Sequence, residues 1–223
     1  AVSPSSAASP AGGGNGALTV STISGCLWTA SATTPWISIS GISAGYQGQI
    51  VADAPVGYWR LGDMDGSIAR ADSGHGVDGA ISGTVTHGLT GATSDADTAT
   101  GFQSAYMEFA GGVPVPAGAF TIEAWVQDGW SGTLAFTSRW RLTIEGGYVQ
   151  FYAERNESPV FDVRTGQPLD DGLWHHLVAV YDPARNAAEL FVDGVLDASG
   201  PTAGKPLQGS AIFLIGPLTA TLD

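Results

Sequence analysis

The stretch FTIEAWV, residues 120–126, decides the fold because apolar and polar side chains alternate along it. Positions 120, 122, 124 and 126 are apolar and share one face, whereas Thr121, Glu123 and Trp125 share the other, which is the period-2 pattern of a strand with one buried face. A second run, WHHLVAVYD at 174–182, is apolar on both faces, which is typical of a central strand in a sheet that is packed on one side and partly covered on the other. Both segments predict β-sheet structure.

Turn signals separate further short apolar runs. Asp193-Gly194 lies between two apolar runs in ELFVDGVLDA (189–198), and this dipeptide favours a two-residue type I′ hairpin. Glu145-Gly146-Gly147 and the segment 182–186 predict two more turns. Other expected strands are GYWRL (57–61), AYMEF (105–109), TLAFT (133–137), RLTIE (141–145), YVQFYA (148–153) and AIFLIG (211–216). So many short strands at this spacing predict an all-β protein of two packed antiparallel sheets.

Length and composition exclude several classes of protein and of binding partner. The 223 residues suffice for one large sandwich, and the 32 glycines and 12 prolines argue against long helices. The chain has 21 acidic and 8 basic residues, a net charge of −13 that would repel nucleic acid and anionic membranes. The sequence contains no run of about 20 apolar residues, so it predicts no segment that inserts into a membrane. Cations, metal ions and neutral ligands remain as expected partners, and the lone Cys26 cannot form an intrachain disulfide.

The first 17 residues, AVSPSSAASPAGGGNGA, contain few large side chains and predict a flexible linker. They lack both the basic start and the apolar stretch of a signal peptide, and the chain does not begin with methionine. We therefore expect a mature or excised segment of a larger protein.

Five segments in order carry a family resemblance: YQGQIVADAPVGYWRLGD (46–63), DSGHGVDG (72–79), YMEFAGGVPVPAGAFTIEAWV (106–126), GLWHHLVAVYD (172–182) and AELFVDGVL (188–196). Together they resemble the laminin G/pentraxin type of concanavalin A-like domain. The resemblance implies a two-sheet antiparallel jelly-roll β-sandwich over residues 46–223. It also implies a secreted, non-catalytic module that binds glycans or cell-surface proteins, often with calcium at one rim.

Residues 18–45 resemble part of a BACON domain, a small immunoglobulin-like module, and form an expected small N-terminal β appendage. The residues that carry this match are Gly25, Cys26, Trp28, Thr29, Ala30, Pro35, Trp36 and Ile37. So short a fragment cannot bury enough apolar surface to fold alone, so we expect it to pack on the sandwich. Members of the laminin G type continue beyond the position of Asp223 into a closing strand. Its absence here would leave an open sheet edge for neighbouring chains.

The pattern of carboxylates and histidines does not predict an enzyme. A glycosidase of this fold needs two carboxylates facing one bond, and no E-x-D-x-E pattern occurs in the chain. The same-face neighbours of Glu123 are Trp125 and Gln127. His175 and His176 point to opposite faces of a strand and cannot chelate one ion, so we expect one imidazole hydrogen-bonded in the core and one near the surface.

Calcium is the candidate cofactor because it prefers carboxylate and carbonyl oxygens, and acidic glycine-rich loops occur three times. Asp72 and Asp78 in DSGHGVDG are the first choice for ligands, followed by Asp63 and Asp65 in GDMDG, while TSDADTAT (93–100) is a third loop of this kind. None of the loops has the EF-hand pattern. The alternative is that these aspartates only form Asx-turns.

Aromatic residues supply the candidate ligand surface, because sugar rings stack on flat apolar faces with a polar edge. Trp59, Trp125 and Trp174 lie in segments that resemble core strands of the family. Trp130 and Trp140 instead flank the segment DGWSGTLAFTSRW, and with neighbouring residues they form the candidate surface. That surface comprises Trp130, Trp140, Tyr148, Tyr152 and Arg155.

The sequence therefore predicts an extracellular, non-catalytic carbohydrate-binding or adhesion module of a larger bacterial-type surface or secreted protein. The alternative is a structural or assembly module of a surface filament, pilus or virus particle. A glycoside hydrolase of the same fold is disfavoured by the carboxylate pattern. An aromatic and polar surface favours glycan binding, whereas a large apolar patch or an unpaired edge strand favours assembly.

Overall fold

The computed structural model describes residues 2–3, 19–20, 45–63, 65–72, 76–93, 97–113, 118–127, 132–155, 158–204, 207 and 214–216. The chain divides into two compact units, residues 1–52 and 53–223. In the first unit, β1 (Val2–Ser3) pairs antiparallel with β2 (Thr19–Val20), and α1 (Gly45–Ala52) ends the unit. Apart from these elements, the expected linker and the BACON-like fragment lie outside the described residues. Residues 46–52, which were expected to begin the sandwich, lie in this helix.

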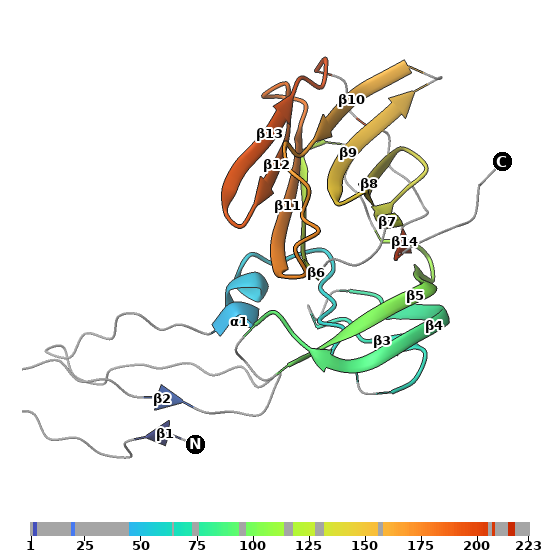
Figure 1. The fold of residues 1–223 in the computed structure, drawn as a ribbon, viewed down its shortest axis with the longest axis vertical. Coiled ribbons are helices and arrows are strands. Elements are labelled where there is room, and N and C mark those ends of the chain that lie inside the picture. Colours follow the sequence, from blue (N-terminus) through green and yellow to red (C-terminus); the bar gives the residue numbers. More distant parts are fainter. Residues whose placement is uncertain are drawn as a thin grey trace, which may run out of the picture. The chain divides into compact units, whose positions relative to one another are not determined.

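The larger sheet of the second unit consists of eight strands (Figure 1). They are β3 (Ile68–Ala69), β4 (Gly79–Thr90), β5 (Thr98–Phe109), β7 (Gly132–Phe136), β8 (Trp140–Glu145), β9 (Tyr148–Arg155), β10 (Ser158–Arg164) and β14 (Leu214–Ile215). Their order in the sheet is β10-β9-β8-β7-β14-β5-β4-β3, and every pairing is antiparallel. The strand that comes last in the described chain therefore lies inside this sheet, between β5 and β7.

The smaller sheet has four antiparallel strands: β6 (Phe120–Gln127), β11 (Trp174–Asp182), β12 (Ala187–Val192) and β13 (Val195–Gly200). Their order is β13-β12-β11-β6. The two stretches that predicted the fold are thus neighbours, since β6 pairs with β11 along its whole length. The prediction of an all-β sandwich of two antiparallel sheets is confirmed.

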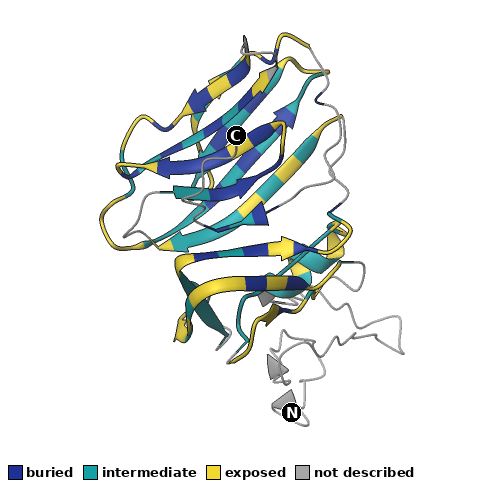
Figure 2. Cartoon of the chain, turned by 90° about the vertical axis from the view of Figure 1, so that its right-hand side faces the viewer, coloured by how far each residue is buried: buried dark blue, intermediate teal, exposed yellow. Residues whose placement is uncertain are grey.

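The core lies between the two sheets and takes alternate residues from each, as Figure 2 shows by the alternation of dark blue with lighter bands. From the larger sheet, Met107 and Phe151 are fully buried, and from the smaller sheet Tyr181 and Leu177 meet them in the same apolar cluster. Burying each such side chain stabilises the fold by about 1.5–3 kcal/mol. Side chains at the intervening positions point outward, and these determine what the protein can bind.

The predicted turns are confirmed by backbone geometry. Asp193 (φ 50°) and Gly194 (φ 79°) connect β12 to β13, and Gly146 (φ 55°) and Gly147 (φ 80°) connect β8 to β9. Positive φ at both turn residues is the type I′ requirement. The expected strand 57–61 is wrong, because only Trp59 forms a bridge, to Ala71. No helix in the described part of the chain is long and apolar enough to cross a membrane.

Candidate functional site

The sequence YVQFYAER folds as β9, and its alternation divides the side chains between the two faces of the larger sheet. Val149 and Phe151 are fully buried in the core. Tyr148, Gln150 and Tyr152 occupy the opposite face and are half-buried. The flanking strands β8 and β10 align their own outward residues with these three.

Tyr152 has a charged neighbour on each side. The strand register places Arg141 of β8 opposite Tyr152, and Asp162 of β10 opposite it on the other flank. Directly opposite side chains in antiparallel strands have Cβ atoms about 4.5–5.5 Å apart. Both charged side chains are exposed, so Tyr152 lies between a hydrogen-bond donor and an acceptor that solvent can reach.

Tyr148 has the same kind of neighbours. Glu145 of β8 lies opposite it across the type I′ hairpin. The guanidinium carbon of Arg164, on β10, lies 4.3 Å from the centroid of the Tyr148 ring. This cation–π contact holds the guanidinium against the ring, while its N–H groups remain available in its own plane.

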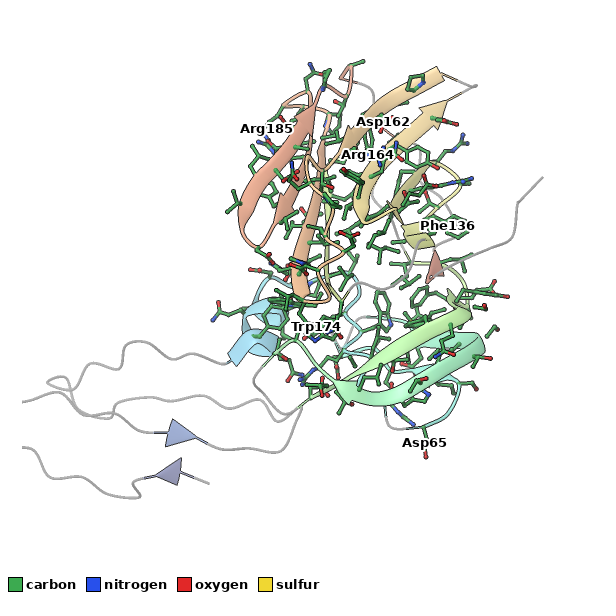
Figure 3. All side chains as sticks on the ribbon, in the orientation of Figure 1. Asp65, Phe136, Asp162, Arg164, Trp174 and Arg185 are labelled. Atoms are coloured by element: carbon green, nitrogen blue, oxygen red, sulfur yellow. The ribbon has the colours of Figure 1, made fainter. Side chains whose placement is uncertain are left out.

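Gln150 connects the two tyrosine positions. Its Nε2 donates a hydrogen bond of 2.7 Å to Oδ1 of Asp162, which fixes that carboxylate beside Tyr152. Figure 3 shows Asp162 and Arg164 on β10. We call this set the β9 face: Arg141, Glu145, Tyr148, Gln150, Tyr152, Asp162 and Arg164. Two aromatic rings with donors and acceptors at their edges can stack on a sugar and bind its hydroxyl groups.

Two of the five predicted ligand-binding residues, Tyr148 and Tyr152, therefore lie on one exposed face. Trp140 is a correction, because it is only 2% exposed and lies in the core. Its ring is 5.3 Å from that of Phe120, so no ligand can stack on it. Trp130 lies outside the described residues. Arg155 ends β9, but its side chain is outside the described part of the chain.

Sequence reasoning missed the other members of this face, which are Arg141, Glu145, Gln150, Asp162 and Arg164. The signal that could have found them is the period-2 pattern of β8, β9 and β10, since each of these residues alternates with buried ones. Two tryptophans assigned to core strands, Trp125 and Trp174, also lie on an outward face, that of the smaller sheet. Trp125 stacks there on His176 with ring centroids 4.9 Å apart.

The two histidines are each within hydrogen-bond distance of a carboxylate, and their side chains are 12% and 22% exposed, so neither is fully buried, although one was expected in the core. Oε1 of Glu123 lies 2.9 Å from Nε2 of His176. His175 lies between two carboxylates, with Asp193 2.8 Å from Nδ1 and Asp171 3.1 Å from Nε2. Burial opposes the charged imidazolium, but the two carboxylates prevail and raise the pKa of His175.

Three of the four aspartates predicted as calcium ligands lie near other polar groups of the chain. Asp63 accepts the backbone N–H of Arg70, and Asp78 accepts that of Ala71. Asp65 is exposed, and Asp72 lies near the guanidinium of Arg60, which also binds Asp97 at 2.6 Å. Among the described residues, no three His, Cys, Asp or Glu side chains converge on a position for a metal ion. These contacts agree with turn-forming and ion-pairing roles for the four aspartates.

Comparison with solved structures shows the same fold in binding domains. The binding domain of Paraclostridial Mosquitocidal Protein 1 has a TM-score of 0.53 at 12% identity, over 69% of this chain and 42% of that chain. A structure described as "Cell entry of botulinum neurotoxin type C is dependent upon interaction with two ganglioside molecules" has a TM-score of 0.54 at 12% identity, over 79% and 46%. The chain thus spans less than half the length of these two structures.

Domain 4 of AbnA, an extracellular arabinanase from Geobacillus stearothermophilus in complex with arabinotriose, has a TM-score of 0.50 at 16% identity, over 66% of this chain and 77% of that chain. At these identities the likeness concerns the fold. No curated protein matches the chain at a significant level. A laminin G family model, described as the concanavalin A-like lectin/glucanases superfamily, matches residues 100–220, which is more than half of the sequence. The chain therefore belongs to the laminin G type of the concanavalin A-like lectin/glucanases superfamily.

Proposed function

We propose that this chain is a non-catalytic carbohydrate-binding module and that the β9 face holds the sugar. The observation that carries the proposal is the outward placement of Tyr148 and Tyr152 on one strand, each with a charged group beside it. An aromatic ring accepts the apolar face of a pyranose, and the charged groups at its edge orient the hydroxyls. Fold relatives described with gangliosides and arabinotriose support a ligand of this class.

The two carboxylates beside the tyrosines, Glu145 and Asp162, are too far apart to act together on one bond. Glu145 and Asp162 are separated by two strand spacings and four residues, which places their backbones about 16 Å apart. Glycosidases need carboxyl groups about 5–9.5 Å apart. The pair can therefore accept hydrogen bonds from a sugar at two places, but it cannot act on one glycosidic bond.

We place the module in an extracellular or surface protein, where it would attach that protein to a glycan or to a glycosylated cell surface. The acidic surface agrees with this setting, because a net charge of −13 keeps the chain away from anionic membranes and nucleic acid. Fold relatives from toxins and from an extracellular arabinanase support it further.

A glycan array followed by isothermal titration calorimetry tests the proposal. Tyr152→Ala should weaken binding of a captured glycan at least tenfold, because the stacking surface is lost. Tyr106→Ala is the matched control: it removes a half-buried tyrosine from the outward face of β5, four strands from β9, and should leave affinity unchanged. Absence of glycan binding, or equal affinities of the wild type and Tyr152→Ala, would contradict the proposal.

A structural or assembly role is the second candidate, because β13 is an edge strand that exposes two apolar residues. Val195 is 68% exposed and Leu196 is 49% exposed. Exposed apolar residues on an edge strand favour pairing with another chain. Concentration-dependent association that Val195→Lys abolishes would support this role, and a monomer at all concentrations would remove it.

A further inference from the structure

The β9 face contains the same arrangement twice. Tyr148 lies beside one acid and one arginine, Glu145 and Arg164. Four residues along the strand, Tyr152 also lies beside one acid and one arginine, Asp162 and Arg141. Gln150 lies midway between the two tyrosines and donates a hydrogen bond to Asp162. Each tyrosine position, here called a subsite, thus offers a ring, a donor and an acceptor. At Tyr148 the guanidinium of Arg164 lies over one face of the ring, so a sugar can stack only on the other face.

Each subsite pairs one arginine with one acid, and the exposed Glu154, two residues beyond Tyr152 on the same face of β9, adds a further negative charge. These charges decide the class of ligand. In the described part of the chain, no carboxylate lies within ion-pair distance of Arg141 or Arg164, so their N–H groups can donate to a ligand. A guanidinium can donate to two neighbouring hydroxyls at once, and a carboxylate can accept from two. A hydroxyl both donates and accepts, so it suits such a pair. An acidic sugar would be attracted by the guanidinium but repelled by Asp162 or Glu145, by Glu154 and by the net charge of −13 of the whole chain, so the balance favours an uncharged sugar.

The spacing decides the length of the ligand. Residues four apart on a strand are about 13 Å apart, because each residue rises about 3.3 Å. That distance exceeds the reach of one pyranose ring. A ligand that stacks on both tyrosines must therefore be an oligosaccharide that lies along β9, with its middle over Gln150.

We propose that the β9 face binds a neutral oligosaccharide along the strand, with one sugar at Tyr148 and another at Tyr152. This inference rests on the proposed function. It adds that the ligand is uncharged and that two subsites act together. Affinity should therefore rise steeply once the ligand spans both subsites, since the second contact is then intramolecular.

Calorimetric titrations of the full chain with neutral oligosaccharides of one to six units, taken from the array hits, test the inference. Affinity should rise at least tenfold between the monosaccharide and the length that reaches both rings, and then level off. Raising NaCl from 50 to 300 mM should change it less than twofold, because no ligand charge is screened. For a spanning ligand, Tyr148→Ala and Tyr152→Ala should each cost about tenfold, but Tyr106→Ala should cost nothing.

The variants also separate a lost contact from a lost fold. Tyr148→Phe keeps the ring and its contact with Arg164, so it should retain most of the affinity for the spanning ligand. Tighter, salt-sensitive binding of uronic or sialylated oligosaccharides would overturn the neutral ligand. Equal affinity for all lengths, or a Tyr148→Ala variant that binds like the wild type, would overturn the two subsites while leaving the proposed function intact. Absence of any glycan binding, or a Tyr152→Ala variant that binds like the wild type, would reject both.

Discussion

At the scale of single residues, the two faces of a strand decide whether an aromatic side chain is core or ligand surface. Trp140 was predicted on the ligand surface because it ends a glycine-containing loop segment, yet as the first residue of β8 it points inward. Trp125 was predicted in the core, although the sequence places it on the same face as Glu123. The alternation of side chains along a strand therefore predicts the burial of an aromatic residue better than resemblance to the core strands of a family does.

Replacing Trp140 with alanine should destabilise the fold strongly. The indole packs at the core against Phe120 and Phe151, and removing a buried tryptophan costs about 3–5 kcal/mol. Tyr152→Ala, on the outward face, should cost less than about 1 kcal/mol. Urea denaturation of both variants measures the difference in the free energy of unfolding. Equal losses would mean that Tyr152 also supports the core.

The titration of His175 should make stability depend on pH. Both ring nitrogens face carboxylates, which at neutral pH only accept hydrogen bonds, so the doubly protonated ring fits best. The pKa of His175 is raised by Asp193 and Asp171 against the opposing effect of burial. A raised pKa in the folded state contributes stability below about pH 6.5, and this contribution is lost as the pH rises through the folded pKa.

Asp193→Asn should flatten this dependence. Asparagine tolerates the positive φ of the turn and can still accept the N–H of His176, so the hairpin is kept. The amide that replaces the second carboxylate oxygen no longer favours the charged ring, so the pKa of His175 should fall. NMR titration of the His175 ring in both proteins measures this shift. An unchanged pKa would assign the raised value to Asp171 alone.

At the scale of elements, the β8–β9 hairpin sets the position of the first subsite, because Tyr148 directly follows the turn. Gly146 and Gly147 both have positive φ. A Cβ on Gly146 would meet open space, whereas one on Gly147 would lie 2.9 Å from Cβ of Pro168. Gly146→Ala should therefore cost only the left-handed strain of about 1–2 kcal/mol.

Gly147→Ala should cost more than Gly146→Ala, since it adds the clash with Pro168 to the same strain. It should also weaken glycan binding, because the start of β9 must shift to relieve the contact. Thermal denaturation and calorimetric titration of the two variants provide a matched comparison. Equal melting temperatures would contradict this prediction, because they would show that Pro168 can move away from the added Cβ without a loss of stability.

The strength of the apolar pattern explains which elements the sequence could predict. Segments 120–126 and 174–182 alternate or are apolar throughout, and they became β6 and β11 with ends within one residue. β4 (GAISGTVTHGLT) has three glycines and few large apolar residues, so no pattern identified it. β10 has a proline as its second residue, Pro159, which suits an edge strand but hides the strand signal.

The β9 face could be predicted only in part, because the sequence does not show which residues of neighbouring strands lie opposite one another. Tyr148 and Tyr152 could be found because they lie in one strongly alternating run. Arg141 and Asp162 join them only through the register of two hairpins, and register depends on turn geometry and on the buried face. The alternation within one strand therefore predicted the two aromatic rings of the candidate site. Its charged residues come from neighbouring strands and could be found only from the strand pairing in the structure.

At the scale of the whole molecule, acidity dominates the surface. A net charge of −13 and a pI near 4.3 mean that carboxylates repel one another at neutral pH. Asp72 shows the effect: partial desolvation and the charges of Asp97 and Asp63 raise the pKa of Asp72, although Arg60 opposes them. Any cation at high concentration should therefore stabilise the fold somewhat by screening.

Calcium should stabilise the protein no more than other salt of equal ionic strength. Asp63 and Asp78 already accept backbone N–H groups, and Arg60 supplies the positive charge beside Asp72. A specific site filled at a hundredfold excess over its dissociation constant would add about 2.7 kcal/mol, a shift of several degrees in melting temperature. Melts in CaCl₂, in MgCl₂, in NaCl of matched ionic strength and with chelator separate the two cases. A shift specific to calcium that Asp72→Asn abolishes would restore the calcium site that the loop sequence predicts.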